Sequence, residues 1–435
     1  MGGGARRVAV VGAGMVGLAT AWYLRERGVE VTVLDREGVA AGASWGNAGW
    51  LTPAIATPLP DPAVLRYGVR AVLSAHSPVY VPPTADPQLA RFVAGFVRHS
   101  TNNRWERAMQ ALLPVNEQSL AAFEHLAEHG VEAPVRDADP FIAAYDRAGD
   151  VQGLLDEFAH IEHAGGRVDH ELIGGDEARR REPALSDAVQ AAIVIHGQRY
   201  LRPVEYVESL AQAVRAQGTE IIVGSEVLGV EDLGAAGVRV DASGPGSGTY
   251  DAVVVATGAW LGRLVAPFGV QHVVQAGRGY SFSVETEHLP ASPVYFPAAR
   301  VALTPLGERL RVAGMMEFRR PDAPLDPRRI TAIVEAARPL LRGADLDHRQ
   351  DEWVGSRPVT ADGLPLIGRT SSERVFVAGG HGMWGITLGP ITGQLLAEQI
   401  TTGTVPAALT PFDPLRSLSW APTWLRRRSA ADAGA

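Results

Sequence analysis

The chain has 435 residues, of which 46% are hydrophobic and 20% are charged, and its formal net charge is −8. This length is enough for roughly two or three domains, and the composition is that of an ordinary globular protein. The acidic balance argues against a nucleic-acid surface. Because there is no cysteine, disulfides, thiolate metal sites, cysteine nucleophiles and cysteinyl links to a cofactor are excluded.

The first 35 residues read as one β-α-β unit. Residues 7–11 (RVAVV) form an apolar, β-branched run, apolar positions then recur at helical spacing as far as Gly28, and an alternating strand ends at Asp35. The apolar residues 8–24 follow two arginines and superficially resemble a leader peptide. The regular glycines and the strand that follows favour a folded segment.

The rest of the chain alternates between loop-rich, helical and strand-like stretches. Frequent prolines and poor periodicity predict a crossover over 53–87. Helices are predicted over 86–100, 104–130, 202–218 and 326–341, and strands over 191–197, 219–224, 237–260 (a hairpin entering a buried strand), 279–284, 294–304, 309–315 and 374–382.

This order predicts an α/β protein with discontinuous domains. Doubly wound segments at both ends of the chain enclose other material, which indicates a Rossmann-like dinucleotide-binding domain built from 1–60, 191–265 and 350–412. A second domain, based on an antiparallel sheet and helices, is expected from 61–190 and 266–349, and a C-terminal tail from 413–435.

The sequence VVGAGMVG carries a dinucleotide-binding fingerprint. Gly12 permits a tight turn, Gly14 lets the backbone approach a pyrophosphate, and Gly17 allows close packing of helix on strand. The helix N-terminus then faces the phosphates. Asp35 lies 21 residues after Gly14, where a carboxylate binds ribose hydroxyls and disfavours NADP. The fingerprint alone leaves NAD and FAD open.

The loop after Asp35 favours FAD. An isoalloxazine ring needs an extended channel that is poor in side chains, and Ala43, Ser44, Ala48 and Gly49 would provide one.

At this point the sequence resembles the FAD-dependent amino-acid oxidoreductases of the glycine oxidase and D-amino-acid dehydrogenase type, in the D-amino-acid oxidase superfamily. The resemblance covers nearly the whole chain. Its carriers are VAVVGAGMVGLATAWYLRERGVEVTVLDRE, GASWGNAGWLTP, VVVATGAW, RGYSF, LRVAGMMEF, GSRPVTADGLPLIG and GGHGMWGITLGP, in the family's order.

The resemblance implies noncovalent FAD and a set of contacts with it. Met15 and Val16 would lie at the pyrophosphate, Asp35 and Arg36 at the adenosine ribose, Ala43 and Ser44 along the diphosphate, Asn47, Ala48, Gly49 and Trp50 beside the flavin, Val227 at adenine, and Thr257 and Gly258 where a strand-turn passes the pyrophosphate.

A second glycine cluster, in GGHGMWGITLGPITG, repeats the fingerprint spacing but has no acidic residue closing a strand about 20 residues later. We therefore expect it to contact the other end of the same FAD. Its backbone amides and the following helix would meet the flavin pyrimidine, where negative charge collects on reduction. The residues concerned are Gly380, His381, Gly382, Met383, Trp384, Gly385, Ile386 and Thr387.

The resemblance also implies a substrate site. Arg357 matches the family's carboxylate anchor, and an arginine fork suits a carboxylate. Tyr280 matches an aromatic residue at the substrate, and Arg278 is a weaker candidate. Glycine oxidase has a second arginine where this chain has Met383, which indicates a more apolar wall and a larger substrate side chain. His381 is a candidate general base, with a backbone-bonded loop histidine as the equal alternative.

The expected activity is oxidative deamination of an amino acid, most simply a D-amino acid, by hydride transfer from the α carbon to flavin N5. Oxidation of secondary amines, including N-substituted glycines and cyclic imino acids, is one alternative, and a nucleotide-binding protein without turnover is another. The electron acceptor is left open between oxygen and a quinone. No metal site is expected, since His160 and His163 are typical of a solvated helix face.

The expected location is cytoplasmic. Trp420, Trp424 and three arginines in the tail leave open a peripheral contact with the inner face of the plasma membrane.

Overall fold

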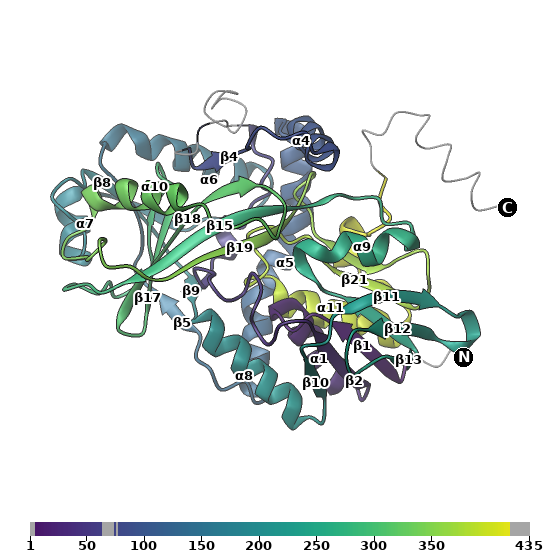
Figure 1. The fold of residues 1–435 in the computed structure, drawn as a ribbon. Helices are drawn as coiled ribbons and strands as arrows, with labels where there is room; N and C mark the ends of the chain where they lie inside the picture. Colours follow the sequence, from purple (N-terminus) through teal and green to yellow (C-terminus); the bar gives the residue numbers. More distant parts are fainter. Residues whose placement is uncertain (1–4, 63–73, 75–76, 418–435) are drawn as a thin grey trace.

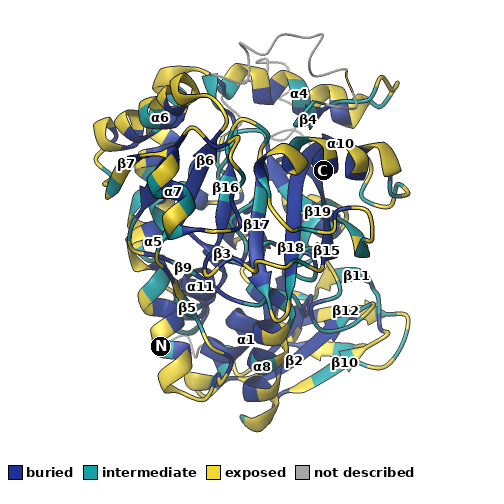
Figure 2. Cartoon of the chain, turned by 90° about the vertical axis from the view of Figure 1, so that its left-hand side faces the viewer, coloured by how far each residue is buried: buried dark blue, intermediate teal, exposed yellow. Residues whose placement is uncertain are grey.

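Two large β-sheets, from segments that alternate along the chain, organise the protein (Figure 1). The structure is a computed structural model, and it describes residues 5–62, 74 and 77–417. The first domain is the six-stranded sheet with its helices, and the second domain is the nine-stranded sheet with its helices. The cores of both sheets are buried, whereas the outer faces of the helices are exposed (Figure 2).

The six-stranded sheet has the strand order of a dinucleotide-binding fold. Its strands in spatial order are β10 (Glu220–Val223), β2 (Glu30–Asp35), β1 (Arg7–Val11), β14 (Ala252–Val255), β21 (Val375–Gly379) and β20 (Leu366–Arg369). All neighbours are parallel except β20, which runs antiparallel to β21. The central strands are apolar because both faces are covered, as expected for parallel strands.

Helices cover one face of this sheet and a small sheet covers the other. On one side α1 (Met15–Glu26), α8 (Pro203–Ala216) and α11 (Gly389–Thr402) share a core with α5 (Asn102–Glu128). On the other side lie β11 (Val227–Asp232), β12 (Val238–Ala242), β13 (Gly248–Tyr250) and α9 (Leu261–Val265). Helices α1 and α11 can pack closely because residue 393 is glycine. A Cβ at this position would lie 2.6 Å from the Ala19 backbone.

The nine-stranded sheet is mostly antiparallel. Its order is β19 (Gln350–Thr360), β15 (Val274–Val284), β18 (Arg309–Phe318), β17 (Val301–Leu306), β16 (Val294–Phe296), β6 (Phe141–Tyr145), β8 (Ala191–Ile195) and β7 (His170–Gly174), with β4 (Val79–Tyr80) paired to β18. Helix α10 (Pro327–Ala337) packs on one face, and α6 (Gln152–His163) on the other.

The remaining elements connect these layers. They are α4 (Pro87–His99), α7 (Gly175–Arg181) and a three-stranded sheet of β3 (Trp50–Leu51), β9 (Gln198–Tyr200) and β5 (Arg136–Ala138). Asp86 is the N-cap residue of helix α4, and its carboxylate accepts hydrogen bonds from the amides of Gln88 and Leu89.

The predicted fold class is confirmed, because a Rossmann-like sheet is combined with a discontinuous domain on a second sheet. The expected boundaries differ from the sheets at two points. Strand β8 begins at residue 191 and β19 at residue 350, and both belong to the nine-stranded sheet rather than to the first domain. Strand β8 is apolar, as parallel-sheet strands are, whereas β19 is mixed in composition, and both pair antiparallel with their neighbours.

Two further findings bear on contact with a membrane. None of the helices in the described part of the chain is long and apolar enough to cross a membrane. Trp420 and Trp424, on which the expected membrane contact depends, lie outside the described residues.

Candidate active site

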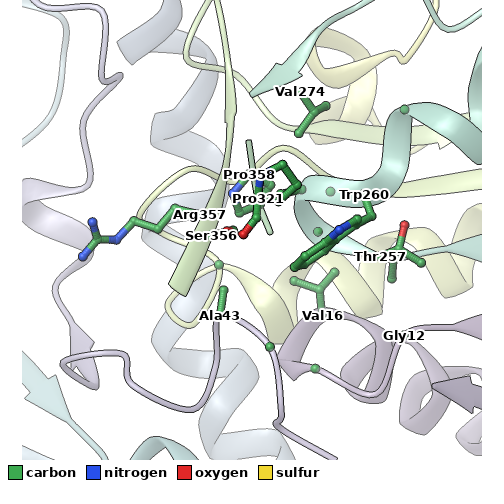
Figure 3. Close-up of a pocket in the computed structure, with 18 of the residues that line it drawn as sticks. Gly12, Val16, Ala43, Thr257, Trp260, Val274, Pro321, Ser356, Arg357 and Pro358 are labelled. Atoms are coloured by element: carbon green, nitrogen blue, oxygen red, sulfur yellow. Dashed lines mark hydrogen bonds between the residues drawn. The ribbon is translucent and has the colours of Figure 1, made fainter. Parts of the chain in front are cut away.

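A cavity of about 1430 Å³ lies between the two domains. First-domain segments line it at the ends of β1, β2, β14 and β21, and second-domain residues line it from β19 and from the segment after β18 (Figure 3). The carboxyl ends of parallel strands form the usual ligand crevice of such folds. The two glycine clusters, far apart in sequence, therefore meet at one cavity.

The first glycine cluster has the geometry that its sequence predicts. Gly12 has φ of +117°, and a Cβ there would lie 2.5 Å from the carbonyl oxygen of Ala256. A Cβ on Gly17 would lie 2.0 Å from the carbonyl oxygen of Gly12, so this glycine allows helix α1 to approach β1. Met15 and Val16, in the first turn of α1, line the cavity. The open helix N-terminus thus points at the cavity as an anion-binding group.

Asp35 ends β2 at the cavity wall. Its Oδ2 accepts a hydrogen bond from the Ala13 amide at 2.8 Å, and its Oδ1 accepts from the amides of Glu37 and Gly38 at 2.8 and 2.9 Å. The carboxylate therefore ties the glycine turn to the end of β2. It also faces the space where the sequence predicts a ribose.

The structure brings most of the expected cofactor residues to this cavity. Those lining it are Gly12, Gly14, Met15, Val16, Asp35, Arg36, Ala43, Ser44, Asn47, Val227, Thr257, Gly258, His381, Gly382, Met383, Gly385 and Ile386. Those that do not line it are Gly17, Ala48, Gly49, Trp50, Gly380, Trp384 and Thr387.

Several residues of the second group support the wall from behind. The Trp50 indole donates to Thr304 Oγ1 at 2.9 Å, while its carbonyl accepts from Thr387 Oγ1 at 3.0 Å. The Trp384 indole donates to the carbonyl of Thr57 at 2.8 Å. The last two bonds join the 50–57 segment to the second glycine cluster, so Trp50, Trp384 and Thr387 position the cavity wall, and their expected contact with the flavin stays a prediction.

Arg357 is a charged side chain of the cavity wall that has no carboxylate partner in the described part of the chain. It extends from β19 (Figure 3), and its Nη1 donates a hydrogen bond to the carbonyl of Met315 at 3.0 Å. Desolvation lowers the pKa of its guanidinium to about 10, and no charged neighbour among the described residues offsets this shift. The group is still a cation at neutral pH. A half-buried cation without a counter-charge is costly, so the site favours an anionic ligand.

The backbone around Arg357 is built to hold it. A Cβ on Gly279, in the neighbouring strand β15, would lie 2.1 Å from the guanidinium carbon, so only glycine leaves room. Met315 has φ of +61°, at an irregularity in the pairing of β15 with β18. That bulge is where the Met315 carbonyl meets the guanidinium.

Tyr280 differs from its expected position. It is fully buried and does not line the cavity. Its hydroxyl donates to Glu317 Oε1 at 2.6 Å, and burial together with Glu317 raises the pKa of the phenol. Arg278 donates to the same oxygen at 2.9 Å. The structure therefore places both residues in the interior of the second domain and not at the substrate.

His381 lines the cavity but is not poised as a general base. Burial lowers the pKa of its imidazole to about 4, so the ring is neutral at neutral pH. Its Nε2 lies 2.9 Å from Thr392 Oγ1 in α11. Of the two interpretations left open by the sequence, the structure favours a histidine that fixes the loop.

Two lining tryptophans were not singled out from the sequence. Trp260 lies under the Arg36 guanidinium, 4.0 Å from its carbon, and both line the cavity. Trp353 lies in a slot where a Cβ on either Gly46 or Gly355 would overlap its ring, at 2.0 and 1.7 Å. The position of each tryptophan depends on a residue distant in sequence, Arg36 for Trp260 and Gly46 for Trp353. Only the requirement for glycine at 46 and 355 could have signalled the slot.

The residues present fit FAD. The cavity joins a helix N-terminus, an acidic residue at the end of β2 and a second glycine loop before α11. The Thr257 hydroxyl lines it, is buried and has no hydrogen-bond partner in the described part of the chain. A polar ligand would satisfy this group. Among the described residues, no group of three or more histidine, aspartate or glutamate side chains could hold a metal ion.

This fold and cavity define a dinucleotide-dependent enzyme of the two-domain flavoprotein class. The family model of the DAO family, FAD dependent oxidoreductase, matches residues 7–399, and the chain belongs to this family. It is therefore an FAD-dependent oxidoreductase.

Similar proteins agree with this assignment. The chain is 32% identical to "D-amino acid dehydrogenase" of Cereibacter sphaeroides over 91% of both chains. It is 29% identical to the protein of the same description from Phenylobacterium zucineum, over 91% of this chain and 93% of that one. The crystal structure of glycine oxidase from Geobacillus kaustophilus aligns with a TM-score of 0.73 and 24% identity, covering 95% of this chain and 100% of that one, which shows a shared fold.

Proposed function

We propose that this chain oxidises the Cα–N bond of a D-amino acid, with Arg357 as the anchor of the substrate carboxylate. The observation that carries the proposal is the half-buried Arg357 guanidinium at the cavity wall, which has one protein hydrogen bond and no carboxylate partner in the described part of the chain. The two relatives described as D-amino acid dehydrogenases support the choice of substrate class and chirality.

A carboxylate suits Arg357 in geometry as well as in charge. A guanidinium has five N–H donors, and a carboxylate can accept two of them in parallel. One donor is held by the Met315 carbonyl, which fixes the plane of the fork before a substrate arrives. Such preorganisation lowers the entropic cost of orienting the substrate.

The same cation also affects the substrate amine. The α-amine of an amino acid must be neutral before its Cα–H hydrogen can leave with two electrons. A guanidinium held at the neighbouring carboxylate disfavours the ammonium form, because like charges repel. His381 adds no further charge, since its pKa of about 4 leaves it neutral.

Bound FAD supplies the acceptor for the hydrogen and the two electrons. The resulting imino acid reacts with water, which gives a 2-oxo acid and ammonia. The chain's own contribution is binding, orientation and exclusion of water. No acid–base dyad is required, because the Cα–H hydrogen leaves with its electron pair.

Met383 shapes the other side of the site. It lines the cavity and packs against the apolar cluster of Phe92, Met316, Phe318 and Val359. An apolar wall binds apolar side chains by removing their surface from water. We therefore propose substrates with a side chain larger than that of glycine.

Anaerobic reduction of the bound flavin tests this proposal directly. The purified holoprotein is mixed with D-amino acids, their L-enantiomers and N-methyl amino acids, and bleaching of the flavin is followed. Faster bleaching by apolar D-amino acids than by glycine or L-amino acids is expected. Fastest bleaching by N-methyl amino acids would instead identify a secondary-amine enzyme, and absence of bleaching by every compound would refute the proposal.

The electron acceptor of the second half-reaction is proposed to be oxygen or a quinone. Reoxidation of the bleached protein by air-saturated buffer and by a soluble quinone, compared in rate, separates the two. A peripheral contact with the membrane through the tail remains part of this proposal, and partition of the full chain between buffer and anionic vesicles tests it.

A further inference from the structure

The segment 319–326, between β18 and α10, crosses from the second domain to the first. Arg320, Pro321 and Asp322 line the cavity, and Pro321 lies beside Ser356 (Figure 3). We call this segment the strap. Residues 323–326, the inner end of the strap, are held by buried charged side chains. Residues 320–322, its outer part, are held by two hydrogen bonds near the cavity.

The inner end of the strap is tied to buried charges. Arg278, 1% exposed, donates to the carbonyls of Ala323 and Pro324 and to Glu317 Oε1. The Tyr280 hydroxyl donates to the same Glu317 oxygen and accepts a hydrogen bond from the Asp326 amide at 3.4 Å. A buried ion pair is weak evidence for stability, because desolvation offsets its attraction. Its effect here is to fix the position of the inner end of the strap, at residues 323–326.

The outer part of the strap is held by two contacts. The Trp260 indole of the first domain donates to Asp322 Oδ1 at 3.2 Å in an exposed bond, and the buried Ser356 donates through its Oγ to the carbonyl of Pro321 at 3.1 Å. The ring of Trp260 also contacts the Arg36 guanidinium. Arg36 follows Asp35, the residue that the sequence predicts at the ribose. The bond between Asp322 and Trp260 therefore joins the domains beside the residues that the fingerprint assigns to the nucleotide.

We infer that the strap is a clamp that slows release of FAD, and that Arg278 and Tyr280 are positioning residues for it. The buried cluster holds the inner end rigidly, while the single Asp322–Trp260 bond closes the outer end over the nucleotide side of the cavity. Opening of the outer part breaks that exposed bond and the Ser356 bond, while Gln275 Nε2 still holds the Arg319 carbonyl at 2.7 Å. This gives a structural role to the two β15 residues, Arg278 and Tyr280, that sequence reasoning assigned to the substrate.

Release of FAD from the holoprotein tests the inference without reference to turnover. Free FAD fluoresces more strongly than bound FAD, so its release into a large excess of buffer gives a rate. In Asp322→Ala the bond to Trp260 is lost, and the release rate is expected to rise about three- to tenfold, the effect of one such hydrogen bond. The matched control is Glu308→Ala, an exposed acid in the turn between β17 and β18.

A second measurement covers the buried end of the strap. Tyr280→Phe is expected to speed release as well, and the double variant with Asp322→Ala should exceed the faster single variant by little, because both act on one element. Amide hydrogen exchange over 319–326 should slow when FAD binds. Release from Asp322→Ala at the wild-type rate, or equal exchange with and without FAD, would overturn the inference even if Tyr280→Phe proved unstable.

Discussion

Replacing Arg357 with methionine keeps an unbranched, flexible stem but removes the guanidinium with its charge and its five donors. The guanidinium is half-buried, has no carboxylate partner in the described part of the chain, and uses one donor on the Met315 carbonyl. A substrate carboxylate in wild type would meet the remaining donors. In the variant it would be desolvated without compensation, which costs about 3 kcal/mol, or roughly 10²-fold in kcat/KM.

The measurement is the rate of anaerobic flavin reduction as a function of substrate concentration. It is made with a D-amino acid and with the corresponding amine that lacks the carboxylate. Wild type should strongly prefer the amino acid, and Arg357→Met should lose that preference while its FAD content stays unchanged. Arg369→Met, which removes an exposed arginine 3.9 Å from Glu373, is the control. Retention of the wild-type preference in Arg357→Met would refute the assignment of this residue.

Three further predictions follow from the packing and titration of the site. Gly279→Ala should reproduce the loss of carboxylate preference with FAD retained, because the added Cβ would lie 2.1 Å from the guanidinium carbon; substrate titration checks this. Gly17→Ala should lower both melting temperature and FAD affinity, whereas Gly149→Ala, exposed, away from the cavity wall and with nothing within 4 Å of its added Cβ, should change neither. The folded-state pKa of His381 is about 4, below the unfolded value of 6.5, so only the unfolded chain gains its proton between these values. The free energy of unfolding should therefore fall as the pH drops from 7.5 to 5, by about 2 kcal/mol more in wild type than in His381→Asn. Equal pH dependence in urea unfolding of the apoprotein would contradict the buried neutral histidine.

Local patterns predicted the first domain well. The turn through Gly12, Gly14 and Gly17 is determined by residues within one β-α-β unit, and each of its requirements is visible in the sequence. Asp35 is likewise found by its spacing from that turn. Features of this kind need no knowledge of what the rest of the chain does.

Features that depend on strand pairing were harder to predict. Every residue of β15 is buried, so alternation does not reveal which face meets the cavity. Gly279 leaves room for Arg357, whereas Tyr280, the next residue, points into the core of the second domain. The contact between Arg278 and Glu317 required the register of β15 against β18. Strand pairing also could not be read for β8 and β19. Their residues were expected in the first domain, whereas both strands pair in the nine-stranded sheet.

The strand order of the first domain bears on how the enzyme is made. Strand β21 lies between β14 and β20, yet it follows every other strand of the described part of the chain in sequence, at Val375–Gly379. Until it is synthesised, β14 has a free hydrogen-bonding edge, which is a site for pairing with other chains. The second glycine loop, at 380–387, follows it directly. The cofactor cavity is therefore complete only once residue 387 has been added, so FAD is expected to bind after this point and to protect the β14 edge by stabilising the closed sheet.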